Sequence, residues 1–182
     1  EHLGFGIMER ETAKTLIRKA LDFANGNQAA FAFQGGEPTL AGLDFFKYFV
    51  RTVKELNTKH SPVFFSIQTN GTMITDEWAK FFTANRFLVG LSLDGDYERN
   101  KFRKMPNGQN SFYKILKAAE CFKRNGTDFN ILTVLTGYCA DNAEDIYRYF
   151  RSKGFGYLQF IPCLRPFDSH EQSELYMTSA QY

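Results

Sequence analysis

The stretch from residue 31 to residue 40, FAFQGGEPTL, places chemically distinctive residues directly after an apolar run. Gly35 and Gly36 have no side chains, so a ligand can approach the backbone there and bond to its amide and carbonyl groups. The carboxylate of Glu37 suits an ammonium group, and Pro38 can occupy the first turn of a following helix. These residue types predict a pocket for an amino group, as in a ligand that carries an amino acid.

Polar side chains also occur near the ends of three other apolar runs. These side chains are Gln68, Ser92, Asp94 and Gln159, and Gln34 is the corresponding residue of the first run. In parallel α/β proteins the ligand site lies beyond the carboxyl ends of the strands, so these side chains are expected to line one site. Ser92 and a nearby arginine would hold a carboxylate there. For any one of these residues, the alternative is ordinary loop polarity or helix capping.

Other common types of site lack their residues in this sequence. Neither a Walker loop nor a G-x-G-x-x-G motif follows the first apolar run, and the three histidines form no Ser/His/Asp arrangement. Cys121, Cys139 and Cys163 are odd in number and far apart, which predicts neither a disulfide framework nor a metal site. The residues alone therefore assign no catalytic group and no metal ligand, and the cysteine usage favours a reducing compartment.

Length and composition predict one globular domain. The 182 residues are 43% hydrophobic and 16% aromatic, enough for one sizeable core. A net charge of +2 is too small to indicate nucleic acid or an anionic membrane as a partner. No window approaches the roughly 18 apolar residues of a membrane span. Because the sequence starts without an initiator methionine and stops in a polar tail, we expect it to be a piece of a larger protein.

Apolar periodicity predicts alternating strands and amphipathic helices. The predicted strands are residues 29–34, 63–69, 87–93, 128–135 and 156–161. The predicted helices are residues 8–25, residues 39–57, a helix beginning after Thr75, a helix from Ser111 to Gly126, and a helix from Asp141 or Asn142 to Gly154. This alternation requires a parallel sheet with crossover helices, either open or part of a barrel.

Four blocks of sequence resemble one known family. The blocks FQGGEPTLAGLDFF, QTNGTMITDEWAKFF, VGLSLDG and FNILTV…GFGYLQFIPCL are similar to the radical S-adenosylmethionine enzymes, and more narrowly to the anaerobic sulfatase-maturating enzymes of the SPASM group. The resemblance spans residues 8 to about 166. It implies an α/β fold, a partial TIM barrel of the (β/α)6 type, that binds S-adenosylmethionine and a [4Fe–4S] cluster.

The resemblance also implies an activity and partners. Reductive cleavage of S-adenosylmethionine would give a 5′-deoxyadenosyl radical, and a Cys or Ser of a sulfatase would be oxidised to formylglycine. The expected partners are the sulfatase polypeptide and a reductant such as flavodoxin or ferredoxin, in the cytoplasm, with neither nucleic acid nor a membrane involved.

Seven residues are carried over from the family as cofactor-binding. Gly36 and its neighbours Gln34, Gly35 and Glu37 would hold the methionine amino group or lie close to it. Ser92 and Arg103 would bind the carboxylate and ribose end, and Leu164 would contact the adenosine through its backbone. The family's usual DGP…HD reads DGDYERN in this sequence, which is a departure beside Arg103.

Two features of the family are missing from this sequence, and they determine which parts of the enzyme we expect this chain to contain. The cluster motif C-x3-C-x2-C and the cysteine-rich SPASM domain are absent. We therefore expect residues 1–166 to be a core that lacks the first barrel strand, and residues 167–182 to lead toward a further domain. The chain alone is expected to bind no cluster and to be inactive. Two alternatives stay open: another SPASM-type peptide modifier, such as a thioether-forming maturase, and a non-catalytic barrel that has lost its cluster.

Overall fold

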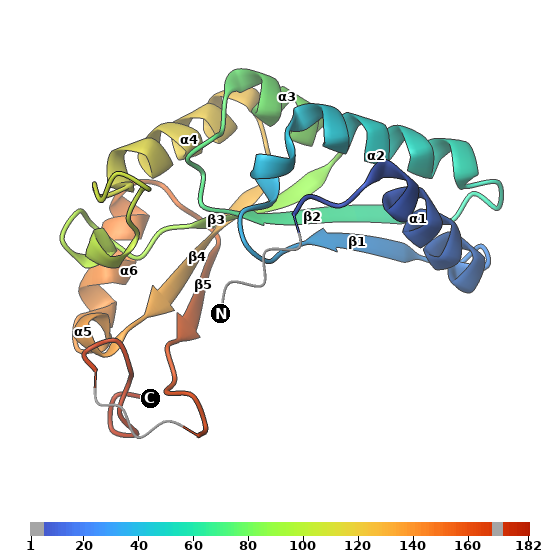
Figure 1. The fold of residues 1–182 in the computed structure, drawn as a ribbon. Helices are drawn as coiled ribbons and strands as arrows, with labels where there is room; N and C mark the ends of the chain where they lie inside the picture. Colours follow the sequence, from blue (N-terminus) through green and yellow to red (C-terminus); the bar gives the residue numbers. More distant parts are fainter. Residues whose placement is uncertain (1–5, 169–172) are drawn as a thin grey trace.

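One parallel sheet organises the chain (Figure 1). The computed structural model describes residues 6–168 and 173–182. The strands, in both chain and sheet order, are β1 (Ala29–Phe33), β2 (Val63–Thr69), β3 (Phe87–Ser92), β4 (Phe129–Leu135) and β5 (Leu158–Pro162). Every neighbouring pair is parallel, and the sheet curls into a half-barrel. The predicted α/β fold and partial barrel are confirmed.

Helices connect successive strands and cover the convex face of the sheet (Figure 1). The α-helices are α1 (Arg10–Ala24), α2 (Leu43–Leu56), α3 (Asp76–Ala84), α4 (Phe112–Asn125), α5 (Gly137–Ala140) and α6 (Ala143–Ser152), and the 3-10 helices are η1 (Pro38–Ala41) and η2 (Arg99–Phe102). Within residues 6–168 and 173–182, none of the helices is long and apolar enough to cross a membrane.

An aromatic layer fills the space between the convex face and the helices. Phe87 of β3 stacks on Phe65 of β2 with ring centroids 5.0 Å apart, and Phe82 of α3 lies 5.2 Å from Phe87. Phe46 of α2 meets Trp78 of α3 edge-on at 5.3 Å. Each buried aromatic side chain contributes roughly 1.5–3 kcal/mol through the hydrophobic effect, so this layer holds the helices on the sheet.

The concave face of the sheet is open by comparison. Because side chains alternate along a strand, the neighbours of the buried residues point away from the helices. Phe64 of β2 and Leu88 of β3 are 55% and 53% exposed on this face, and Gln68 is exposed there too. The alternation thus separates a helix-covered structural face from an accessible face.

The helix predicted over residues 39–57 is wrong in its first turn. The structure has the short 3-10 helix η1, then Gly42 at φ +80°, and only then α2. Pro38 occupies the first turn of η1, as predicted. Leu40 shares the apolar periodicity of α2 but lies on η1, and it is 63% exposed. The positive φ at Gly42 ends the first helical turn, so the apolar spacing crosses a break in the backbone.

The predicted caps have mixed outcomes. Thr75 accepts a hydrogen bond from the Trp78 amide and caps α3, and Gly126 ends α4 in the left-handed conformation. Ser111 makes no capping bond with its side chain. Asn110 Oδ1 instead accepts the Phe112 amide at 3.0 Å, and the Ser111 hydroxyl donates to a backbone carbonyl of the preceding loop. The helix starts where predicted, but the capping side chain is one residue earlier.

The segment 173–182 packs back against the sheet's carboxyl edge. The Tyr138 amide in α5 donates to the carbonyl of Glu174 at 2.8 Å, and the Met177 amide donates to the carbonyl of Cys163 at 2.9 Å. The sequence did not predict α5, which is one turn long. These backbone bonds place a distant stretch of chain beside the ends of β4 and β5.

The aromatic layer yields a stability prediction with a matched control. Phe87→Ala removes a side chain that is 1% exposed, and we expect it to lower the free energy of unfolding by about 3–5 kcal/mol. Phe23→Ala makes the same change on α1 at a residue that is 93% exposed, and should stay within about 0.5 kcal/mol. Urea unfolding of both variants measures the difference. Equal losses would mean that the aromatic layer does not carry the fold.

Candidate active site

The predicted site residues converge on one edge of the molecule. Gln34 to Glu37 follow β1, Ser92 ends β3, Arg103 lies in the loop after β3, and Leu164 follows β5. Because all five strands are parallel, their carboxyl ends share one edge of the half-barrel. The fold therefore collects at this edge residues that are far apart in the sequence.

The glycine pair after β1 gives open access to the backbone. Gly35 and Gly36 have φ values of +85° and +42°, and a Cβ built on either would meet no atom within 4 Å. Residues 34–38 line a pocket of about 910 Å³, which extends along the free edge of β1. Most of this pocket is lined by apolar residues of β1, η1 and α2, and only its end at residues 34–38 belongs to the carboxyl edge. The backbone of both glycines can thus be reached by a ligand.

The carboxylate of Glu37 binds other parts of the protein. Its Oε2 accepts the Asn70 amide at 2.7 Å, and its Oε1 accepts the Thr69 hydroxyl at 2.8 Å. Oε1 also accepts the amide and the hydroxyl of Thr39, the second residue of η1. Both oxygens therefore join the carboxyl ends of β1 and β2. In this structure Glu37 acts as a brace between the two strands, and its charge already has four donors.

A second carboxylate braces the end of β3. Asp94 lies two residues after Ser92, and its carboxylate is paired with Arg103: Nη2 donates to Oδ1 at 2.8 Å, and Nε lies 2.7 Å from Oδ2 without the geometry of a hydrogen bond. Oδ1 also accepts the amide of Val134 in β4 at 2.9 Å. The structure thus brings Ser92 and Arg103 to the same strand end, with the Arg103 guanidinium held by Asp94.

Leu164 lies at the far side of the same edge. Cys163, just before it, donates its amide to the Leu135 carbonyl of β4 at 2.8 Å, which fixes the course of the chain after β5. The Leu164 side chain is exposed. Nearby, Lys101 of η2 lies 3.5 Å from Glu174 and 3.5 Å from the ring centre of Tyr138. These contacts join the loop after β3 to the segment 173–182 and form a rim around this edge.

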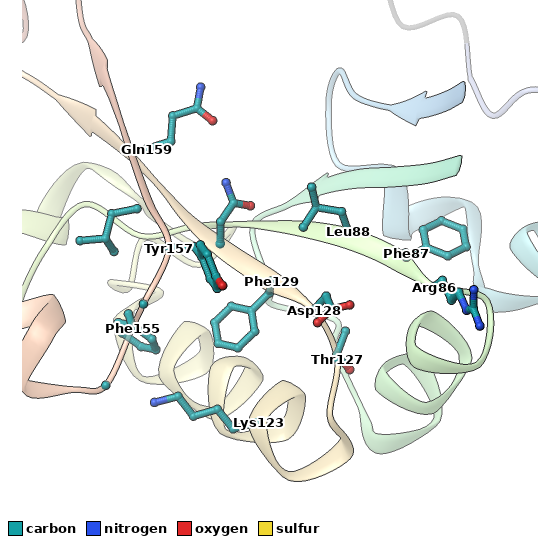
Figure 2. A pocket seen from close by; sticks show the side chains of 14 residues that line it. Arg86, Phe87, Leu88, Lys123, Thr127, Asp128, Phe129, Phe155, Tyr157 and Gln159 are labelled. Carbon is teal, nitrogen blue, oxygen red and sulfur yellow. The ribbon is translucent and has the colours of Figure 1, made fainter. Parts of the chain in front are cut away.

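Gln159 departs from the prediction. It is the second residue of β5 and so lies near the amino end of that strand. Figure 2 shows it beside a separate pocket of about 1010 Å³ at the amino ends of β3, β4 and β5, with Lys123, Asp128 and Tyr157 also on its walls. The run GYLQFI forms the strand two residues later than expected, so the glutamine falls at the opposite end.

The cysteines do not form a metal site. Burial raises the pKa of the Cys139 thiol, and burial together with a hydrogen bond to Asp76 raises the pKa of Cys121. In the part of the chain that the structure describes, no three His, Cys, Asp or Glu side chains are grouped to hold a metal ion. A cluster therefore does not fit the described residues.

Sequence reasoning missed the polar partners of Glu37. Neither Thr69 nor Asn70 was predicted as a site residue. Both lie at the end of β2, in the run QTNGT. A threonine and an asparagine directly after a buried strand, beside a strand that ends in a carboxylate, are the signal that could have paired them.

The fold and this edge define a class of protein: a parallel half-barrel whose ligand site lies at the carboxyl ends of its strands. The family model for the radical SAM superfamily matches residues 4–150. The chain belongs to the radical SAM superfamily.

Curated relatives narrow the comparison. A cysteine-type anaerobic sulfatase-maturating enzyme of Clostridium novyi is 44% identical over 173 residues, which are 94% of this chain and 46% of that protein. A serine-type enzyme of Bacteroides thetaiotaomicron is 32% identical over 91% of this chain and 40% of its own length. The structure of native anSMEcpe with bound AdoMet and Cp18Cys peptide has a TM-score of 0.92 and 42% identity, covering 97% of this chain and 49% of that one. The chain thus spans about half the length of these relatives.

The role of Glu37 as a brace can be tested without any ligand. Glu37→Ala leaves the Asn70 and Thr39 amides without their acceptor, so we expect a loss of about 1–3 kcal/mol in the free energy of unfolding. Glu55→Ala is the control, because Glu55 is exposed and, among the described residues, its carboxylate pairs with Arg51 alone, on the surface of α2. That change should cost no more than about 0.5 kcal/mol. A Glu37 variant as stable as the control would refute the brace.

Proposed function

We propose that this chain is the core of a radical S-adenosylmethionine enzyme that oxidises a Cys or Ser residue of a sulfatase to formylglycine. One observation carries the proposal: the half-barrel collects exposed glycine backbone, Ser92 and Arg103 at the carboxyl edge of a superfamily fold. The 42% identity with a structure that holds AdoMet and a peptide supports both the cofactor and the substrate class.

The residues at the edge suit the methionine end of the cofactor. The open backbone at Gly35 and Gly36 would accept and orient its ammonium group, with Gln34 beside it. Glu37 would contribute by fixing the course of these glycines, because its own oxygens are bound to Thr39, Thr69 and Asn70. When bound, the cofactor supplies the chemistry of hydrogen abstraction.

Ser92, Arg103 and Leu164 would complete the cofactor site. The Ser92 hydroxyl and the free N–H groups of Arg103 can donate to a carboxylate or to ribose oxygens. The backbone after Cys163 is fixed to β4, so the peptide at Leu164 offers a rigid contact for the adenosine. The three residues come from the ends of β3 and β5 and can contact one ligand from two sides.

A [4Fe–4S] cluster would have to be ligated from outside this chain. The described residues group no ligands for it, and Cys121 and Cys139 are buried apart from each other in the fold. We propose that the full-length protein carries the cluster motif in the loop after a first barrel strand, and that this strand would pair with the edge of β1 that no described strand occupies. Residues 1–166 would then be the barrel core, and residues 167–182 would lead toward a C-terminal domain.

The identity values favour a cysteine substrate, since the match is 44% to a cysteine-type relative and 32% to a serine-type one. A reductant such as flavodoxin or ferredoxin would supply the electron, and the reaction would take place in the cytoplasm. The second candidate is another SPASM-type peptide-modifying enzyme, which the shared half-barrel supports equally well. The difference between the two lies in the peptide that is modified.

Turnover by the full-length protein tests the proposal. After anaerobic reconstitution with iron and sulfide, we expect 5′-deoxyadenosine and a formylglycine product from a Cys-containing sulfatase peptide, and less product from the Ser peptide. The same peptide with Ala at that position is the control and should give no formylglycine. Mass spectrometry measures both products. Iron uptake without formation of 5′-deoxyadenosine would contradict the proposed enzyme, and a thioether product would support the second candidate.

Cofactor affinity tests the site assignment separately. In the full-length protein, Arg103→Ala should weaken S-adenosylmethionine binding by about tenfold to a hundredfold, because it removes charged hydrogen bonds. Ser92→Ala should cost about threefold to tenfold, for one neutral donor. Lys104→Ala is the control: it changes an exposed cation next to Arg103 and should leave the affinity unchanged. Anaerobic calorimetry that finds the wild-type affinity in both site variants would refute these assignments.

A further inference from the structure

Asp94 lies at the centre of a contact between three segments. Its side chain is only 8% exposed, and its carboxylate binds both Arg103, from the loop after β3, and the Val134 amide of β4. Its own amide donates to Oδ1 of Asn100, a fully buried residue of the same loop. A buried carboxylate is stable when cationic and N–H donors satisfy it, and here Arg103 supplies the charge.

The backbone of Arg103 is fixed independently of Asp94. Its amide donates to the Asn100 carbonyl at 3.0 Å, and its carbonyl accepts both the amide and the hydroxyl of Ser111. Removal of the Asp94 charge would therefore free the guanidinium while the loop around it keeps its backbone bonds. An effect of Asp94 on the position of the Arg103 guanidinium can thus be measured separately from an effect on the fold of the loop.

The contact with Asp94 also determines which N–H groups of the Arg103 guanidinium remain available to a ligand. A guanidinium has five N–H donors in one plane; Asp94 accepts a hydrogen bond from Nη2 and lies within ion-pair distance of Nε. Among the residues that the structure describes, none accepts a hydrogen bond from Nη1. With one side of the plane held by Asp94, the opposite side points in a defined direction, and less rotamer freedom is lost when a ligand binds there.

We propose that Asp94 is a positioning residue for cofactor binding: it holds the Arg103 guanidinium at the end of β3, the strand that Ser92 ends, so that its remaining N–H groups meet the carboxylate of the ligand. This inference rests on the proposed function, because it takes Arg103 as a cofactor contact. Asp94 itself acts through Arg103 and needs no contact with the cofactor. The same loop contains a matched pair, Asp96 and Arg99, which are also joined by an ion pair.

A double-mutant cycle in the full-length protein tests the inference. Asp94→Asn removes the charge but keeps an oxygen that can accept the Val134 amide. We expect it to weaken S-adenosylmethionine binding by about tenfold. Arg103→Gln should weaken binding by at least as much, and the double variant should be no weaker than Arg103→Gln alone. Anaerobic calorimetry gives the affinities, and thermal unfolding gives the stability of each variant.

Asp96→Asn is the control, because it removes one of the two carboxylates that pair with Arg99 in the same loop and should leave the affinity unchanged whatever its effect on stability. If Arg103→Gln weakens binding while Asp94→Asn binds like the wild type, the positioning role is refuted and the cofactor site stands. Losses that add in the double variant would also refute it, since Asp94 would then act independently of Arg103. If Arg103→Gln has no effect, the cofactor assignment itself fails, and the inference fails with it.

Discussion

The parallel direction of the five strands is the constraint on which the rest of this structure depends. It places all the carboxyl ends at one edge, and it requires a covering helix between each pair of strands. The aromatic layer satisfies this requirement by burying the convex face against those helices. The concave face stays accessible, and the carboxyl edge carries the polar side chains and open backbone where a ligand can bind.

Two carboxylates fix this edge. Glu37 joins the ends of β1 and β2, and Asp94 joins the ends of β3 and β4 to Arg103. Both carboxylates accept backbone amides across strands as well as side-chain donors, so each holds a loop in place. A ligand that binds between them would meet groups whose positions are already set, which lowers the entropic cost of binding.

Much of the fold could be predicted because its signals are local. Apolar periodicity and caps gave all five strands to within two residues at either end, and the strand 63–69 agrees with β2 at both ends. The break at Gly42 was missed because the apolar spacing continues across it. The site was predicted as a set of residues at one edge, but the pairing within it was not. Asp94 and Val134 are 40 residues apart, and their contact depends on strand register, which no local pattern specifies.

The most direct test of the central claim is a crystal structure of the full-length protein with S-adenosylmethionine. The account predicts cofactor density at the carboxyl edge, in contact with the backbone at Gly35 and Gly36 and with the side chains of Ser92 and Arg103. Density in the pocket at the amino ends of β3, β4 and β5, beside Lys123, would contradict it.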